Sequence, residues 1–204
     1  MWGVVLYSRA SSPPRALRLL DAGVTKASVA SECREAALGF VAGVAAGWDK
    51  LDLALWLTGP YARATRHAPG GERVVYVAHA HADIDGTSLE ELVTRVRSQV
   101  MASLETAALD FGRIDFADDA LERGIVRKAM DEEGALCFVP VDSPRLRLRD
   151  RVRSLIAADY LSVPYAYADL FVCHRCESVV FDERAKQAGV CRRHRISGAV
   201  PRSP

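Results

Sequence analysis

The sequence lacks any long apolar run. Its longest stretch without a charged residue spans only residues 36–48, far short of the roughly 20 apolar residues that cross a bilayer. Residues 1–14 also lack a basic segment leading into an apolar core, which a secretory signal would require. We therefore expect neither a membrane span nor a signal peptide, and a cytoplasmic location.

Lysine is also scarce, since it makes up only four of the 27 basic residues. The net charge of +1 hides an uneven distribution along the chain. From Arg145 to the end, basic residues exceed acidic ones by six, whereas the preceding part is acidic by five. A basic end predicts contact with an anionic partner or with the protein's own acidic body.

No internal repeat or low-complexity tract interrupts the 204 residues, half of which are hydrophobic. Short β-rich or alternating runs at residues 2–7, 51–57, 73–77, 113–116 and 135–141 predict strands. Apolar stripes and cap residues predict helices over residues 27–48, 88–109, 118–130 and 143–160. This alternation predicts an α/β domain over residues 1–161, with a mixed or mostly parallel sheet of about five strands flanked by helices.

Two pairs of metal-binding residues stand near the end of the chain. Cys173 and Cys176 are separated by two residues, as are Cys191 and His194, and 14 residues lie between the pairs. Zinc takes about four nitrogen or sulfur ligands in a tetrahedron, and a two-residue spacer lets one turn present two of them. The spacing resembles a zinc ribbon or zinc-knuckle module over residues 168–197, followed by a flexible tail at residues 198–204. The resemblance implies one structural zinc per chain. His174 could replace His194 as the fourth ligand, but its neighbours on both sides compete for the same turn, so we expect His194.

Arginines surround this motif and precede it. A zinc ribbon commonly contacts nucleic acid or protein, so the resemblance implies interaction rather than catalysis. The candidate anion-binding residues are Arg145, Arg149 and Arg153 on the preceding helix, and Arg175, Arg192, Arg193 and Arg195 around the metal. We expect the partner to be nucleic acid or an acidic protein surface.

A second candidate site lies just before the helix that begins near residue 88. In an extended chain, His79, His81, Asp83 and Asp85 point to one face, where they could hold a second divalent metal. The sequence His79-Ala-His-Ala-Asp83 resembles the first metal motif of metallo-β-lactamase-fold hydrolases. The sequence Asp83-Ile-Asp-Gly-Thr87 resembles the nucleophile motif of haloacid-dehalogenase-type phosphatases, which makes Asp83 and Asp85 candidate catalytic residues. The spacing of 56 residues between a histidine of this segment and Cys137 also resembles that of the catalytic pair in caspase-like peptidases.

Three hypotheses for function follow. The first is a zinc-containing interaction or regulatory protein. The second is a metal-dependent phosphoester hydrolase that uses residues 79–85, although the same segment also fits a strand end followed by a helix cap. The third is a scaffold subunit of a larger assembly, because Gly39, Gly43 and Gly47 share one helix face that allows close packing.

Overall fold

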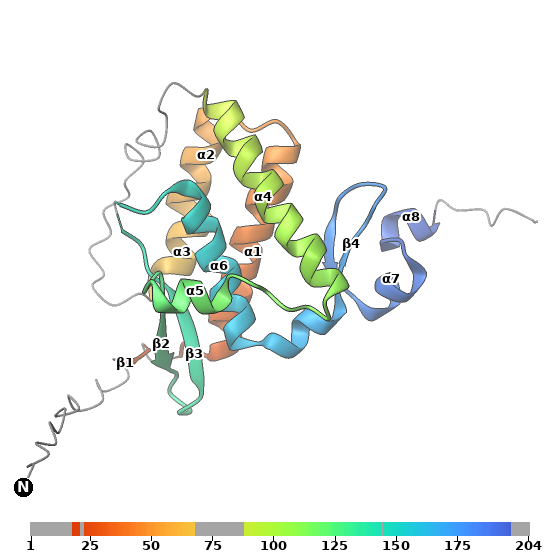
Figure 1. Cartoon of the computed structure of the whole chain (residues 1–204). Helices are drawn as coiled ribbons and strands as arrows, with labels where there is room; N and C mark the ends of the chain where they lie inside the picture. Colours follow the sequence, from red (N-terminus) through yellow and green to blue (C-terminus); the bar gives the residue numbers. More distant parts are fainter. Residues whose placement is uncertain (1–17, 21–22, 68–87, 144, 197–204) are drawn as a thin grey trace, which may run out of the picture.

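A computed structural model describes residues 18–20, 23–67, 88–143 and 145–196 and shows a mainly helical protein (Figure 1). The predicted α/β domain with a five-strand sheet is wrong. The described part contains one sheet of three short strands and one of two. The main helices are α1 (Lys26–Ala45), α2 (Lys50–Trp56), α3 (Ala62–Thr65), α4 (Leu89–Leu109), α5 (Ala117–Glu122) and α6 (Leu148–Ser162).

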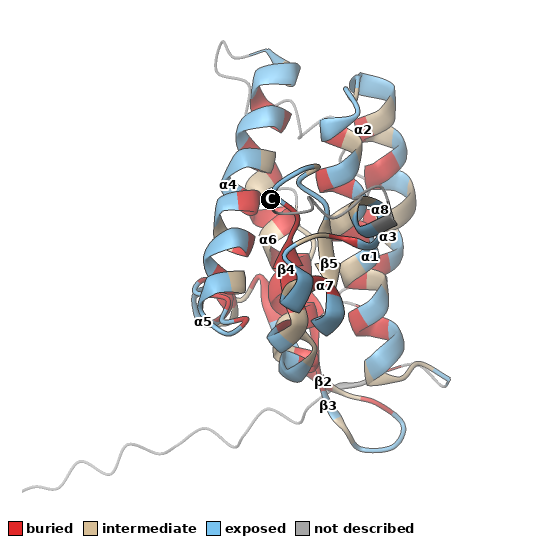
Figure 2. Cartoon of the chain, turned by 90° about the vertical axis from the view of Figure 1, so that its right-hand side faces the viewer, coloured by how far each residue is buried: buried red, intermediate tan, exposed pale blue. Residues whose placement is uncertain are grey.

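Helix α6 lies at the centre of the bundle. It contacts α1, α4, α5 and both strands of the neighbouring hairpin, and eleven of its fifteen residues are buried. The buried positions of α1 and α4 face the bundle interior around it (Figure 2). A helix buried on nearly all sides must satisfy its polar groups internally, which explains the ion pairs of α6 described below.

Side chains before three helices determine where those helices begin. Thr25 with Ser28, Asp49 with Asp52, and Ser88 with Glu91 each form a reciprocal capping box. Each box satisfies backbone N–H groups that have no partner within the helix. The helix predicted over residues 88–109 is confirmed as α4, including its cap.

Residues 51–57, predicted as a strand, form a helix instead. Helix α2 continues through a π-helical segment, η1 (Leu57–Tyr61), into α3. The alternating leucines suggested a period of two, but Leu53, Trp56 and Leu57 are buried while Leu51 and Leu55 are exposed. This three-to-four-residue spacing belongs to a helix, and the Asp49 capping box is the sequence signal that supports it.

The three-stranded sheet lies at one end of the bundle. Strand β2 (Val126–Met130) pairs antiparallel with β3 (Leu136–Pro140) and parallel with the two residues of β1 (Arg18–Leu19). The strand predicted at residues 135–141 is therefore present. Residues 113–116 form no strand, since only residues 115–116 are assigned and they form a turn. The helix predicted over 118–130 is shorter, because α5 ends at Glu122 and Gly124, with φ +69°, separates it from β2. The predicted strands at 2–7 and 73–77 lie outside the described residues.

Gly39 and Gly43 of α1, and Gly47 just after it, do not form one open packing face. The Gly43 backbone lies against the Trp48 ring, where an added Cβ would come within 1.9 Å of ring atoms. Gly47 has φ +88° and follows the end of the helix. Gly39 alone remains mid-helix with open space around it. Only Gly43 is therefore covered within the chain, and the three glycines do not share one helical face as scaffold packing would require.

The end of the described chain forms a small unit against the bundle. After α6 and the 3-10 helix η3 (Pro164–Asp169), β4 (Leu170–Val172) pairs with β5 (Val179–Phe181), followed by α7 (Glu183–Ala188) and α8 (Arg192–Ile196). One side of this hairpin belongs to the main core through Leu170 and Val172. Across the described residues, no helix is long and apolar enough to cross a membrane.

Candidate metal centre

The first pair of ligands is held by the turn between β4 and β5. The Cys173 N–H donates to the Ser178 carbonyl at 3.0 Å, which closes the end of the ladder. The Cys173 carbonyl in turn accepts from the N–H groups of Cys176 at 3.3 Å and Glu177 at 2.7 Å. This tight turn places both thiols on the same side of the hairpin.

The second pair lies at the start of α8. Asp182 caps α7, and Gly189 ends that helix with φ 65°. The N–H groups of His194 and Arg195 then both donate to the Cys191 carbonyl at 3.0 Å. The 14 residues between the pairs therefore contain one strand, β5, and one helix, α7.

The four side chains form one cluster. Their ligand atoms, from Cys173, Cys176, Cys191 and His194, all lie within 4.8 Å of one another. Cys176 Sγ lies 3.7 Å from Cys191 Sγ, and His194 Nδ1 lies 3.4 Å from the sulfurs of both Cys173 and Cys191. Tetrahedral zinc with its usual bond lengths requires about 3.8 Å between sulfurs and about 3.6 Å from sulfur to nitrogen. The donor set and its spacing therefore fit a zinc ion.

The surroundings of Cys173 favour its thiolate over its thiol. Burial of this thiol raises its pKa, but hydrogen bonding from the backbone at Cys191 and Arg175 and from the His194 ring stabilises the thiolate more strongly. The pKa of Cys173 falls to about 5 as a result. A thiolate is the form of cysteine that binds metal, so the lowered pKa of Cys173 favours metal binding by this side chain.

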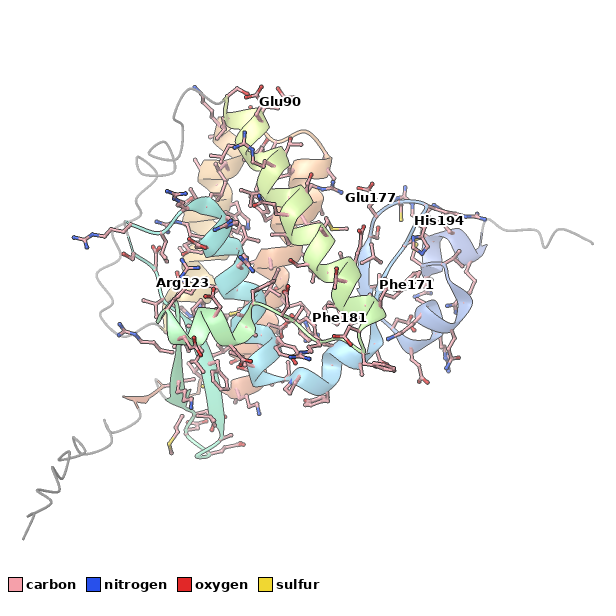
Figure 3. All side chains as sticks on the ribbon, viewed as in Figure 1. Glu90, Arg123, Phe171, Glu177, Phe181 and His194 are labelled. Atoms are coloured by element: carbon pink, nitrogen blue, oxygen red, sulfur yellow. The ribbon has the colours of Figure 1, made fainter. Side chains whose placement is uncertain are left out.

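The remaining cysteines and His174 are not part of the cluster. Cys33 and Cys137 are fully buried in the bundle. The alternative ligand His174 is exposed, and its ring stands at 87° to that of Phe171. Figure 3 shows His194 and Phe171 on the hairpin and helix unit, at the edge of the molecule.

The candidate anion-binding arginines fall into two groups. Around the cluster, Arg175, Arg192, Arg193 and Arg195 are all exposed. The other group does not form one free stripe. Arg145 precedes α6, Arg149 lies 3.8 Å from Asp150, and the Arg153 guanidinium lies 4.2 Å from the Phe116 ring centroid.

The structure does not describe the second candidate site. His79, His81, Asp83 and Asp85 lie within residues 68–87, outside the described part of the chain. The prediction of a second metal or of catalysis by Asp83 and Asp85 is therefore untested by the structure.

Two features that the sequence analysis missed join the metal unit to the bundle. Arg97 of α4 pairs with Glu177 in the metal-binding turn at 2.5 Å. Arg34 of α1 and Tyr167 of η3 both hydrogen-bond to Asp159 of α6. Asp159 follows Leu155 and Ile156 at helical spacing, so an acidic residue on the apolar face of α6 was the available signal.

Comparison with protein-family models, with curated proteins and with solved structures finds no match for the chain.

Proposed function

We propose that this protein binds one structural zinc ion and uses the metal-held unit to contact an anionic partner. The observation that carries the proposal is the four-ligand cluster, whose spacing fits tetrahedral zinc. A site with four protein ligands has no open position for substrate, so zinc serves folding and display of the surface.

The charge around the cluster supports an anionic partner. Arg175 lies between the first two ligands, Arg192 and Arg193 lie between the last two, and Arg195 follows directly. All four are exposed. The ligand spacing therefore brings arginines from two separate segments to one unit. Their targets would be nucleic-acid phosphates or the carboxylates of an acidic protein surface.

Metal content tests the first half of the proposal. Elemental analysis of protein purified without chelator or nickel should give one zinc per chain. Substitution His194→Ala should abolish stoichiometric zinc, whereas His174→Ala should retain it, because only His194 belongs to the cluster. Zinc retained by His194→Ala, or lost from His174→Ala, would contradict this ligand assignment.

Binding tests the second half. Zinc-loaded protein is titrated with a short DNA duplex and with polyglutamate at several salt concentrations. We expect affinity for one of them to fall steeply with salt, and Arg192→Glu with Arg195→Glu to weaken it and to reduce the slope by about one per lost phosphate contact. Arg63→Glu, an exposed arginine on α3, is the matched control. Binding that is insensitive to salt, or equal loss in the control, would contradict an arginine-mediated contact.

A further inference from the structure

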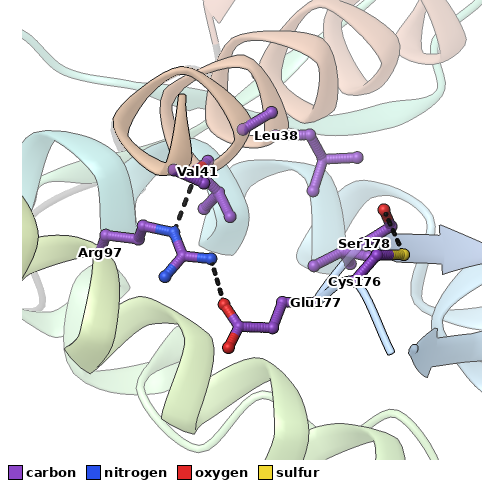
Figure 4. A pocket seen from close by; sticks show the side chains of 9 residues that line it. Leu38, Val41, Arg97, Cys176, Glu177 and Ser178 are labelled. Atoms are coloured by element: carbon purple, nitrogen blue, oxygen red, sulfur yellow. Dashed lines mark hydrogen bonds and ion pairs between the residues drawn. The ribbon is translucent and has the colours of Figure 1, made fainter. Parts of the chain in front are cut away.

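A cleft lies between α1 and the metal-binding hairpin (Figure 4). Its volume of about 320 Å³ is within the range of small-molecule sites. One wall consists of α1 residues and the other of the turn after β4, with Arg97 of α4 between them. The lining residues are Leu38, Val41, Ala42, Ala45, Arg97, Cys176, Glu177, Ser178 and Val179.

Arg97 supplies a fixed cation in this cleft. Its Nε donates to the Val41 carbonyl at 3.1 Å, and its Nη2 donates to Glu177 at 2.5 Å. The remaining nitrogen, Nη1, makes no hydrogen bond or ion pair within the described ranges. The side chain is only 17% exposed, so the guanidinium offers a partly desolvated, oriented donor to an anion.

Glu177 is a weakly held partner for Arg97. Its side chain is 61% exposed, and an ion pair with an exposed member contributes little stability. The carboxylate of Glu177 therefore occupies a position on Arg97 that another carboxylate could take.

The other walls favour an apolar ligand body. Leu38, Val41 and Val179 supply aliphatic surface. Ala42 and Ala45 carry short side chains toward the same cleft and leave it open. A second negative charge on the ligand would have no cation within the lining and would lie near Glu177.

We propose that this cleft binds a small aliphatic monocarboxylic acid. The ligand's carboxylate replaces Glu177 on Arg97, and its chain lies along the α1 wall. The inference is independent of the anionic partner proposed above, because it involves none of the arginines around the metal.

The test is a titration of the zinc-loaded full-length chain with straight-chain carboxylates from acetate to octanoate, followed by amide chemical shifts in NMR. We expect saturable binding at one site, with shifts in α1 and the Cys176–Val179 turn. Affinity should rise about three- to fourfold per added methylene until the cleft is filled. The alcohol of matching length should bind at least tenfold more weakly, because it lacks the charge that Arg97 requires.

Variants determine which residues bind the ligand. Arg97→Gln should weaken binding at least tenfold, while Glu177→Gln should strengthen it because a competing carboxylate is removed. Ala45→Leu should block the cleft from the exposed side of α1, and Arg95→Gln, an exposed neighbour on α4, should change nothing. Zinc content is measured for every variant, so that a loss of binding is not confused with a loss of the metal unit.

Several results would overturn the proposal. These are the absence of saturable shifts with every chain length, unchanged binding by folded Ala45→Leu, or equal binding of the alcohol. Binding of inorganic phosphate at these residues in place of the carboxylates would also overturn it.

Discussion

Arg34 of α1 holds Asp159 of α6 through two hydrogen bonds, from Nε to Oδ2 at 2.8 Å and from Nη2 to Oδ1 at 3.0 Å. Asp159 is fully buried and also accepts from the Tyr167 hydroxyl at 2.7 Å. The same guanidinium lies 4.3 Å from the centroid of the Phe181 ring in β5. One side chain thus joins the two central helices and supports the hairpin that carries the metal ligands.

We expect Arg34→Met to lower the free energy of unfolding by about 3 kcal/mol, because it leaves a buried carboxylate with too few partners. Removing one partner of a buried ion pair usually costs about 3–5 kcal/mol. The lower value applies here because the Arg34 side chain is 26% exposed. Urea denaturation measures this change. The double variant Arg34→Met with Asp159→Leu should regain much of the loss. A single variant as stable as the wild type would show that the pair contributes little.

Asp131 should make stability depend on pH. The Lys26 N–H at the start of α1 lowers the pKa of Asp131 most, and the N–H groups of Ala135 and Glu133 in the β2–β3 turn lower it further. Because the pKa is lower in the folded chain than in the unfolded one, the ionised group stabilises the protein at neutral pH. This contribution is lost as the pH falls through the folded-state pKa.

The variant Asp131→Asn checks this assignment. Its deficit in the free energy of unfolding relative to the wild type should be largest near neutral pH and should shrink in acid. Urea denaturation across the acidic range measures both proteins under the same conditions. A deficit that stays constant with pH would show that the charge of Asp131 is not responsible.

Two glycines of α1 should respond in opposite directions to alanine. Gly39→Ala should stabilise the protein by about 0.5–1 kcal/mol, because alanine favours the helix and nothing lies within 4 Å of the added Cβ. Gly43→Ala should destabilise it by about 1–3 kcal/mol. The Trp48 ring, which packs edge-on against Phe40, would have to move. Thermal unfolding of both variants tests this contrast, and equal shifts would contradict it.

Removal of zinc should unfold one part of the chain selectively. The small cluster beneath α7 and α8 contains Phe171, Cys173, Ala185 and Cys191 as its buried residues, and two of these are metal ligands. We expect a chelator to abolish hydrogen-exchange protection of α7 and α8 while α1, α4 and α6 stay protected. Protection of α7 that survives complete zinc removal would show that packing alone maintains the unit.

The metal ligands were predictable because their chemistry is local in sequence. Two residues between ligands define a turn whatever surrounds it, so the cluster follows from the spacing of Cys173, Cys176, Cys191 and His194. Helix α4 was predictable for a related reason, since its cap and apolar stripe both lie within the same 22 residues.

The fold class was not predictable in the same way. The leucines of α2 satisfy a period of two and a helical period at once, and the decision depends on Trp56 packing against Phe40 and Tyr61. The pairs Arg34 with Asp159 and Arg97 with Glu177 join residues more than 75 positions apart. Such pairs arise only when segments far apart in the sequence are placed side by side, which no local pattern specifies.

The metal unit has almost no hydrophobic core of its own, and this affects how its sequence can change over evolution. Positions such as Arg184, Gln187, Arg192 and Arg195 are exposed, and under the proposed function a zinc ion rather than side-chain packing determines the path of the backbone beneath them. Substitutions there can alter what the unit recognises without disturbing the helical bundle. Binding specificity can therefore diverge among descendants of this protein while the four ligands stay the same.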